Sequence, residues 1–423
     1  VRQMFPGCPG SLSGRGAAER RRRKETPEAR FADEKYGGKE EGCAPRRRPP
    51  TGFAMVYNEI KHVLPHFAFE GRFHSVRELH SGNINNTYHL VYLDRGGKLN
   101  HYALQHINNY VFKDPAVVMR NIEMICDYLR ESYLNDGVDP KRRMLELIRV
   151  HGNGYLYLDE RGGFWRSYHY IDGATAYDRV EKPEHFFEAG RGFGEFQRRL
   201  CSFPAGQLAE TIPHFHDTRK RFYAFVAAVD NDRAGRVRGL EKEIDFFFDR
   251  RKMMSEIVCR IESGTLPLRV THNDTKINNV MTDNETGKAL CVIDLDTVMP
   301  GSVLYDFGDA IRFGASTAAE DEPDTSRISV DMNLFRLFTA GFLSEVNVGF
   351  LTKEEILLLP LGVKVLTCEL AMRFLTDYID GDLYFKVKDP EHNLVRAHAQ
   401  MALLEDVERK YDEMCAFVAG LAN

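Results

Sequence analysis

The segment "THNDTKINNVM" (residues 271–281) determines how the rest of this 423-residue chain is interpreted. It has the pattern His-x-Asp-x-x-x-x-Asn, in which Asp274 and Asn279 supply a carboxylate and an amide and Lys276 stands between them. A short apolar run, the polar turn "DNETGK" and a second apolar run that ends in Asp294 follow. Two apolar runs around a polar turn predict a short hairpin, with polar side chains emerging into a cleft at its strand ends.

These residue types match the needs of phosphoryl transfer from ATP. The reaction needs a carboxylate that orients the attacking hydroxyl and accepts its proton, oxygen ligands for Mg²⁺, and a cation near the γ-phosphoryl oxygens. Asp274 provides the carboxylate, Asn279 and Asp294 provide the oxygen ligands for Mg²⁺, and Lys276 stands where a cation is useful. Taken singly, such residues are more often turn caps or solvated strand ends, but their combined spacing predicts a kinase-type site.

The region upstream of this site, residues 55–173, is expected to form a small nucleotide-binding lobe rich in strands. Two pairs of apolar runs surround turns at 94–97 and 159–163, and each pair predicts a hairpin. Between them, Asp114 followed by Pro115 predicts the capped start of one main helix.

Residues 174–423 are expected to form a larger catalytic and substrate-binding lobe that is mostly helical. Helical patterns run through 218–262, 331–350, 353–380 and 391–421. In the segment "EHFFEAGRGFGEFQRRL", the pattern places four residues on one face: Phe187, Gly190, Phe193 (or Gly194) and Leu200. The order of elements predicts an α+β fold with a small strand-rich lobe followed by a large helical one.

The first 54 residues differ in composition from the rest. Residues 1–50 carry 13 Lys and Arg against 7 Asp and Glu, and they show no apolar periodicity, which predicts a disordered basic extension. A basic tail can bind nucleic acid or a membrane surface, but the simpler interpretation is a dispensable extension before a first helix headed by Met55. The remainder carries 44 basic against 55 acidic residues, which disfavours nucleic acid as its partner.

The eight cysteines are scattered and form no CxxC pair, which argues against a zinc site or a disulfide scaffold. Neither a secretory signal pattern nor an apolar run of membrane-spanning length is evident. We therefore expect a cytoplasmic protein without a membrane partner, and a small acceptor makes a monomer sufficient.

Three segments resemble the aminoglycoside phosphotransferase and choline kinase superfamily, which has a two-lobed, protein-kinase-like fold. Its pattern of His-x-Asp-x-x-x-x-Asn, hydrophobic-Ile-Asp and a later Gly-Asp-Pro-x-x-Asp-Leu-Ala-like segment is similar to residues 272–279, 292–294 and 301–310. Within that superfamily, "THNDTKINNVM", "CVIDLDTVMPG" and "YDFGDAIRFG" look closest to the N-acetylhexosamine 1-kinases, as do "LQHINNYVFKDP" and "IPHFHDTRKRF". The resemblance covers about residues 56–420.

The resemblance implies roles for individual residues. Asp274 would bind the anomeric hydroxyl of the sugar and act as catalytic base, while Asn279 and Asp294 would hold Mg²⁺. Positions similar to Thr297, Arg373 and Tyr384 would hold the sugar. Simpler alternatives are a turn cap at Thr297, a helix ion pair between Arg373 and Glu369, and a core position for Tyr384.

The small lobe departs from the protein-kinase pattern. The position of the usual strand lysine is Gln105, with His106 beside it, and neither supplies the full charge of lysine. Glu123 is the candidate for the helix glutamate that pairs with that position. The loop before the second strand lacks a GxGxxG pattern, and its candidates for phosphate contact are Gly82, Asn83, Asn85 and Thr87; an ordinary hairpin lead-in is the alternative.

The stretch "YDFGDAIR" (305–312) contains the letters Asp-Phe-Gly, which carry the metal-binding aspartate in protein kinases. Because the predicted hairpin already delivers Asp294, Asp306 is not expected to bind metal. The resemblance implies that Asp306 supports the catalytic loop from behind by accepting its backbone N–H groups, with Asp309 as the fallback and His272 as a further supporting residue.

Together these observations predict an ATP- and Mg²⁺-dependent kinase that phosphorylates the C1 hydroxyl of GlcNAc or GalNAc, giving the sugar 1-phosphate and ADP. Two alternatives stay open: a kinase of the same superfamily acting on choline, homoserine or an aminoglycoside, and a pseudokinase that binds nucleotide without turnover. The missing strand lysine is the main support for the pseudokinase.

Overall fold

The computed structural model describes residues 52–79, 85–152, 154–346 and 349–422. The helices are α1 (Gly52–Ile60), α2 (Pro115–Asn135), α3 (Pro183–Leu200), α4 (Thr218–Asn231), α5 (Glu241–Glu262), α6 (Val303–Gly314), α7 (Met332–Glu345), α8 (Lys353–Leu357), α9 (Leu359–Asp380) and α10 (His392–Leu421). The strands are β1 (Arg72–Leu79), β2 (Asn86–Leu93), β3 (Leu99–Ile107), β4 (Tyr157–Leu158), β5 (Phe164–His169), β6 (Ala174–Ala176), β7 (Arg269–Thr271), β8 (Val280–Asp283), β9 (Ala289–Val292) and β10 (Met299–Gly301).

The N-terminal part is an antiparallel sheet with strand order β1-β2-β3-β5-β4. Its first predicted turn is confirmed: the Asp94 carboxylate accepts the backbone N–H groups of Gly96 and Lys98 at 2.8 Å each, and Gly97 has a φ of +84°. A left-handed residue at this point suits glycine and tightens the link between β2 and β3. The second predicted turn joins β4 to β5.

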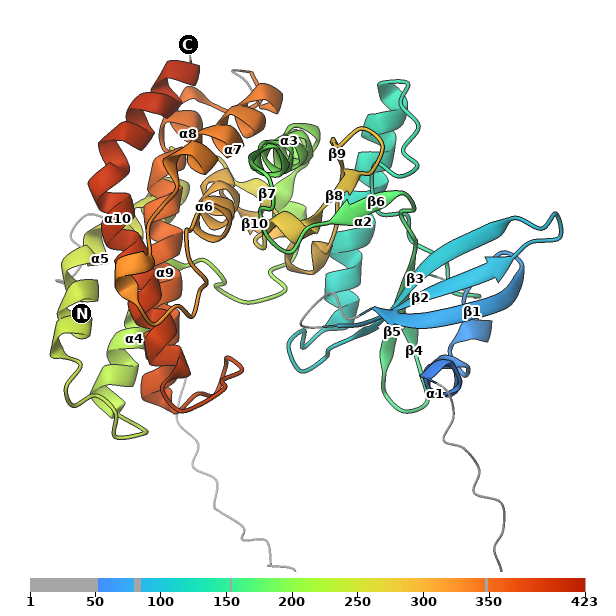
Figure 1. The fold of residues 1–423 in the computed structure, drawn as a ribbon, viewed down its shortest axis with the longest axis horizontal. Helices are drawn as coiled ribbons and strands as arrows, with labels where there is room; N and C mark the ends of the chain where they lie inside the picture. The colour runs from blue at the N-terminus through green and yellow to red at the C-terminus, as the bar shows by residue number, and fades with distance from the viewer. Residues whose placement is uncertain (1–51, 80–84, 153, 347–348, 423) are drawn as a thin grey trace, which may run out of the picture.

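Helix α2 starts where the sequence predicts. The side chain of Asp114 accepts the N–H groups of Ala116 and Val117, and Pro115 occupies the first turn. In Figure 1, α2 lies between the N-terminal sheet and the helical C-terminal part. Asn121 on α2 donates to the carbonyls of Ala209 and Val298, so α2 is fastened to the C-terminal part.

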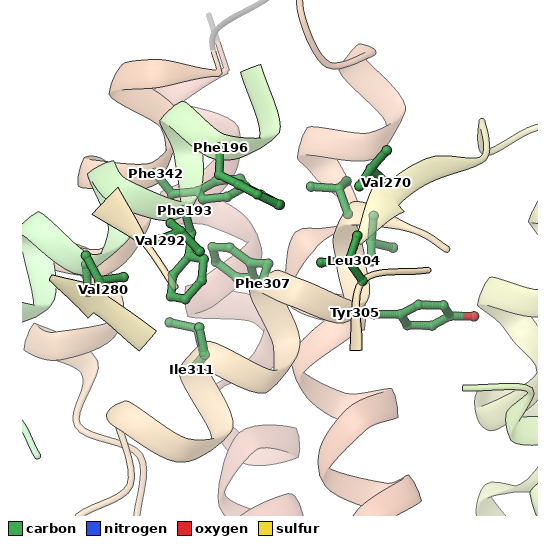
Figure 2. Packing of buried hydrophobic residues seen from close by; sticks show 14 of the residues in the cluster. Phe193, Phe196, Val270, Val280, Val292, Leu304, Tyr305, Phe307, Ile311 and Phe342 are labelled. Carbon is green, nitrogen blue, oxygen red and sulfur yellow. The ribbon is translucent and has the colours of Figure 1, made fainter. Parts of the chain in front are cut away.

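The C-terminal part is largely helical, and its core holds the β8–β9 hairpin in place. Figure 2 shows Phe193 and Phe196 of α3 packed around Val280 and Val292 of the hairpin together with Phe307 of α6. These side chains are almost completely buried. The hairpin that carries the predicted site therefore rests on the main core of the helical part.

Helices α6 and α9 cross with their backbones in contact. A Cβ atom on Gly308 would lie 2.3 Å from the carbonyl oxygen of Gly362, and one on Gly362 would lie 2.1 Å from that of Leu304. No larger residue fits at either position, so this crossing is fixed by two glycines.

The sequence-based helix limits need correction. The pattern at 218–262 divides into α4 and α5, because Asp232 adopts a left-handed conformation and Gly235 and Gly239 follow with positive φ. The pattern at 353–380 divides at Leu358 into α8 and α9. The first helix begins at Gly52, ahead of Met55, and ends at Ile60.

The buried face of α3 also differs from the prediction: Phe186 is buried there, whereas Phe187 is only partly buried. Within the described residues, no helix combines the length and apolar character needed to cross a membrane. The expected order, a sheet-rich N-terminal part followed by a helical C-terminal part, is confirmed.

Candidate active site

The predicted site is built on two adjacent strand pairs. Strand β7 leads into the loop 272–279 and β10 pairs with β7, while β8 and β9 form the hairpin that follows the loop. Val280 pairs with Val292, and the Ile293 N–H donates to the Asn279 carbonyl at 2.9 Å. The register therefore brings Asn279 and Asp294 together at one end of the hairpin.

The Asp274 carboxylate has one partner on each oxygen. Lys276 Nζ lies 2.8 Å from its Oδ1, and Asn279 Nδ2 donates to its Oδ2 at 3.3 Å and to its backbone carbonyl at 2.7 Å. Burial lowers the pKa of Lys276, but the Asp274 carboxylate outweighs this and raises it above the usual value. The three residues singled out in the loop are thus in direct contact.

Asp294 occupies the turn after β9 with a left-handed backbone (φ +60°, ψ +63°). Its side chain is open to solvent, and no described residue makes a hydrogen bond or ion pair with its carboxylate. The protein atoms around it, followed by the carboxylates of Asp296 and Asp274, raise its pKa to about 7. An accessible carboxylate beside two others attracts a cation.

The arrangement at Asn279 and Asp294 suits a hard divalent cation. Because Asn279 Nδ2 donates to Asp274, its amide oxygen points away from those contacts and is available as a ligand. That oxygen and the Asp294 carboxylate are the donor types that Mg²⁺ prefers.

Two buried aspartates on α6 hold the loop from behind. Asp306 accepts the backbone N–H groups of His272 at 2.9 Å and Asn273 at 2.8 Å, which are the contacts that the resemblance implied. Asp309 accepts the N–H of Thr275 at 3.0 Å and binds Arg312 at 2.7 Å. Burial raises the pKa of Asp309, but Arg312 and Lys276 outweigh this and leave it below the usual range.

His272 links the loop to the hairpin. Its Nε2 lies 2.9 Å from the carbonyl oxygen of Ile293, and its Nδ1 accepts the Asp274 N–H at 3.3 Å. These partners require the neutral tautomer with the proton on Nε2. The ring packs edge-on against Phe193 and Phe196, so its position is fixed by the core.

Only part of the predicted nucleotide set is brought together. Gly82 and Asn83 lie outside the described residues. Thr87 accepts a hydrogen bond from Gln105 at 3.1 Å, and Asn85 donates to Asp296 at 2.7 Å.

The expected strand–helix pair is not formed within the described part of the chain. Glu123 makes no hydrogen bond or ion pair with Gln105 or His106 there; its pKa is raised by burial and by Asp127. His106 stacks on Trp165, with ring centroids 4.4 Å apart.

The cation near Gln105 is one that the sequence analysis missed. Arg166 of β5 is 1% exposed; its Nε donates to Gln105 Oε1 at 2.9 Å and its Nη1 forms an ion pair with Asp296. The sequence contains one indication of this ion pair: Arg166 and Asp296 are charged residues within the apolar runs "FWRSYHY" and "CVIDLDTV". Their partnership depends on the sheet register, which a motif does not reveal.

The residues predicted to hold a sugar are placed as follows. Arg373 lies over the ring of Tyr384, 5.6 Å from its centroid, and 3.9 Å from Glu369. Tyr384 is 60% exposed, so the alternative that it belongs to the core is wrong. The Thr297 hydroxyl donates to the His272 carbonyl at 2.7 Å, which ties its turn to the catalytic loop.

Further charged residues surround Arg373 and were not predicted. His216 Nδ1 lies 2.8 Å from Glu369, and its ring packs on Tyr305, next to Asp306, with centroids 4.9 Å apart. Burial lowers the pKa of Arg221, and the nearby guanidinium of Arg373 lowers it further. The contact with Tyr305 places this cluster beside α6, which supports the catalytic loop.

Comparisons with known proteins agree with this architecture. The model of the phosphotransferase enzyme family (APH) matches residues 75–328, more than half of the chain. A microcompartment-associated aminopropanol kinase has a similar structure with a TM-score of 0.51 at 15% identity, covering 85% of this chain and 98% of that one. A choline/ethanolamine kinase family protein from Mesorhizobium loti has a similar structure with a TM-score of 0.50 at 13% identity, covering 82% of this chain and 92% of that one.

At these identities the structural likeness shows the fold alone, and it confirms the expected α+β, protein-kinase-like architecture. The family match spans most of the N-terminal sheet, the catalytic loop, the hairpin and α6. This chain belongs to the phosphotransferase enzyme family.

Proposed function

We propose that this kinase transfers the γ-phosphoryl group of ATP to the C1 hydroxyl of an N-acetylhexosamine, with Mg²⁺. The contact set of Asp274, with Lys276 on one oxygen and Asn279 on the other, is the observation that carries phosphoryl transfer. Membership of the phosphotransferase family supports the reaction class. The sugar acceptor rests on the sequence resemblance and on the charges near Arg373.

Asp274 would act as the base. Its side chain is 28% exposed, so an acceptor hydroxyl can reach the carboxylate, and the contacts with Lys276 and Asn279 fix its orientation. A carboxylate placed in this way aligns the hydroxyl for in-line attack and takes up its proton. Lys276 would remain protonated and place positive charge near the transferred group.

Asn279 and Asp294 would hold the metal ion. When bound, Mg²⁺ neutralises phosphate charge and orients the transferred group. The side chain of Asp294 is open to solvent and has no cationic partner of its own among the described residues, which leaves it free for this task.

The charges around Arg373 favour a neutral acceptor. Arg373 and Arg221 lie close enough for one guanidinium to lower the pKa of the other. Two arginines against the single carboxylate of Glu369 leave a net positive charge, which disfavours the ammonium groups of choline or an aminoglycoside. Their guanidinium groups can donate hydrogen bonds to sugar hydroxyl and carbonyl oxygens. The exposed ring of Tyr384 offers an apolar face beside them.

A panel of acceptors tests the proposal. The purified protein with Mg²⁺ and ATP should release ADP with GlcNAc or GalNAc, and phosphorus NMR should place the phosphate on C1. An Asp274→Asn protein should retain under about 1% of the turnover, since general base catalysis contributes roughly 10²–10⁴-fold. Glu285→Gln, in the exposed turn of the same hairpin, is the matched control and should remain active.

Phosphate at C6, or turnover confined to choline, homoserine or an aminoglycoside, would refute the sugar 1-kinase. Mg²⁺-dependent ATP binding without turnover of any acceptor would favour the pseudokinase.

A further inference from the structure

Arg166 stands where the nucleotide site lacks its usual cation. In the sheet, Gln105 of β3 occupies the position at which protein kinases carry a phosphate-binding lysine, and Arg166 of β5 is its direct cross-strand partner. The two side chains are joined by the hydrogen bond from Arg166 Nε to Gln105 Oε1 at 2.9 Å. A full positive charge is thus present beside the lysine position, on the neighbouring strand.

The guanidinium is held by few partners. Besides the Nε contact, Nη1 pairs with Asp296 and lies 4.0 Å from the sulfur of Met119 on α2. Arginine has five N–H groups, and Nη2 has no hydrogen-bond partner among the described residues. A charged donor without a protein partner can form a charge-assisted hydrogen bond with an anion that reaches it.

The surroundings place this guanidinium next to the proposed metal site. Asp296 lies two residues after Asp294, whose carboxylate is near enough to raise the pKa of Arg166. The other oxygen of Asp296 accepts a hydrogen bond at 2.7 Å from Asn85, at the end of the loop before β2. Strand β3, Asn85 and the turn that carries Asp294 and Asp296 therefore converge on Arg166.

We propose that Arg166 is the phosphate-binding cation of the nucleotide site, replacing the strand lysine, and that Asp296 and Gln105 hold it in position. The inference rests on the proposed use of ATP and adds the residue that contacts its phosphates. The guanidinium contributes its free N–H groups to phosphate oxygens, while Asp296 remains its counter-charge.

Nucleotide affinity measured by calorimetry, without any acceptor, tests this assignment. Arg166→Gln alone leaves the buried carboxylate of Asp296 unpaired and can prevent folding, so the main variant is Arg166→Gln with Asp296→Asn. Affinity for ADP and ATP should fall at least about tenfold, because hydrogen bonds from charged groups are lost. Affinity for adenosine, which has no phosphate, should stay within about twofold of the native protein.

Moving the charge back to the lysine position is the second test. Gln105→Lys combined with Arg166→Gln places a cation on β3 opposite the former arginine, still close to Asp296. This protein should recover ADP affinity to within a few-fold of native. Failure to recover, with the protein folded by circular dichroism, would contradict the phosphate role.

A matched control is Arg250→Gln with Glu408→Gln, a bidentate pair between α5 and α10. It should lower the melting temperature and leave ADP affinity unchanged. An equal loss of adenosine and ADP affinity in the Arg166 variants would show a purely structural role and overturn the proposal. Because acceptor is absent throughout, a wrong sugar assignment cannot produce either result.

Discussion

The carboxylate of Asp306 lies behind the peptide of His272 and accepts its N–H at 2.9 Å, so α6 supports the loop that carries Asp274. Asp306→Asn should weaken stability and turnover together, since one buried backbone N–H would lose its carboxylate partner at a cost of about 1–3 kcal/mol. The Mg²⁺ concentration for half-maximal activity should stay unchanged. Urea unfolding and Mg²⁺-dependent kinetics measure the two effects.

Asp406→Asn is the control for this prediction. Asp406 is a buried aspartate on α10 that accepts the N–H of Val330 at 2.7 Å, beyond the C-terminal end of α6. Its loss should reduce stability by a similar amount and leave kcat within about twofold of native, as expected for distant independent sites. A selectively raised Mg²⁺ requirement in Asp306→Asn would instead place Asp306 on the metal.

Asp294→Asn, unlike Asp306→Asn, should change the Mg²⁺ requirement of the enzyme. The substitution removes the negative charge from a carboxylate that has no protein cation bound to it in the described structure. The Mg²⁺ concentration for half-maximal activity should rise at least about tenfold, as one charged ligand is lost. Mg²⁺ titration of ADP release measures this, and an unchanged Mg²⁺ requirement would remove Asp294 from the metal site.

Arg373→Met should weaken binding of the acceptor without affecting binding of the nucleotide. The variant keeps an apolar stem over the rings of Phe215 and Tyr384 but removes the donors expected to bind the sugar. The KM for the sugar should rise about tenfold or more, with the KM for ATP unchanged. Arg250→Met, which removes another arginine packed on an aromatic ring, that of Phe246, is the matched control and should leave both KM values unchanged. Equal effects in the two variants would contradict an acceptor role for Arg373.

His89 should make the stability of the protein depend on pH. Burial, then the charges of Arg77 and His101, lower the pKa of His89 to about 4, while Asp172 opposes them. An unfolded histidine has a pKa of about 6.5. Between these values the unfolded chain binds a proton that the folded chain does not, so stability is lost as pH falls from about 6.5 to about 4.

The loss attributable to His89 should reach about 3 kcal/mol at the low end of that window. His89→Gln should flatten this part of the profile in urea unfolding at a series of pH values. His151→Gln, at an exposed position in the same half of the chain, should leave the profile as it is. An identical slope in native protein and His89→Gln would refute the assignment.

The parts of the fold that the sequence predicted well are those with local causes. The turn at Asp94 and the cap at Asp114 depend on side chains that bind backbone groups within a few residues. The catalytic loop and hairpin are also nearly contiguous, so spacing alone indicated that Asp274, Asn279 and Asp294 would meet.

Contacts between distant segments were beyond such reasoning. Arg166 meets Gln105 only because of the pairing of β3 with β5, and it meets Asp296 only because the sheet packs against the turn that follows β9. A residue that looks in the sequence like a surface charge is thus buried, in contact with both Gln105 and Asp296. The break between α4 and α5, in contrast, could have been predicted from the sequence. Gly235 and Gly239 indicate a helix end, but the apolar periodicity on both sides of them was interpreted as one continuous helix.

The contact between Gly308 and Gly362 fixes α6 in place relative to α9. With the two backbones touching, α6 and α9 have no space in which to slide, yet α6 holds the loop of Asp274 and α9 carries Arg373. Asp274, the proposed base, and Arg373, the proposed acceptor contact, are therefore held at a fixed separation. If both residues bind the acceptor, as proposed, this separation sets the size of the acceptor, because neither helix can shift to meet a smaller one.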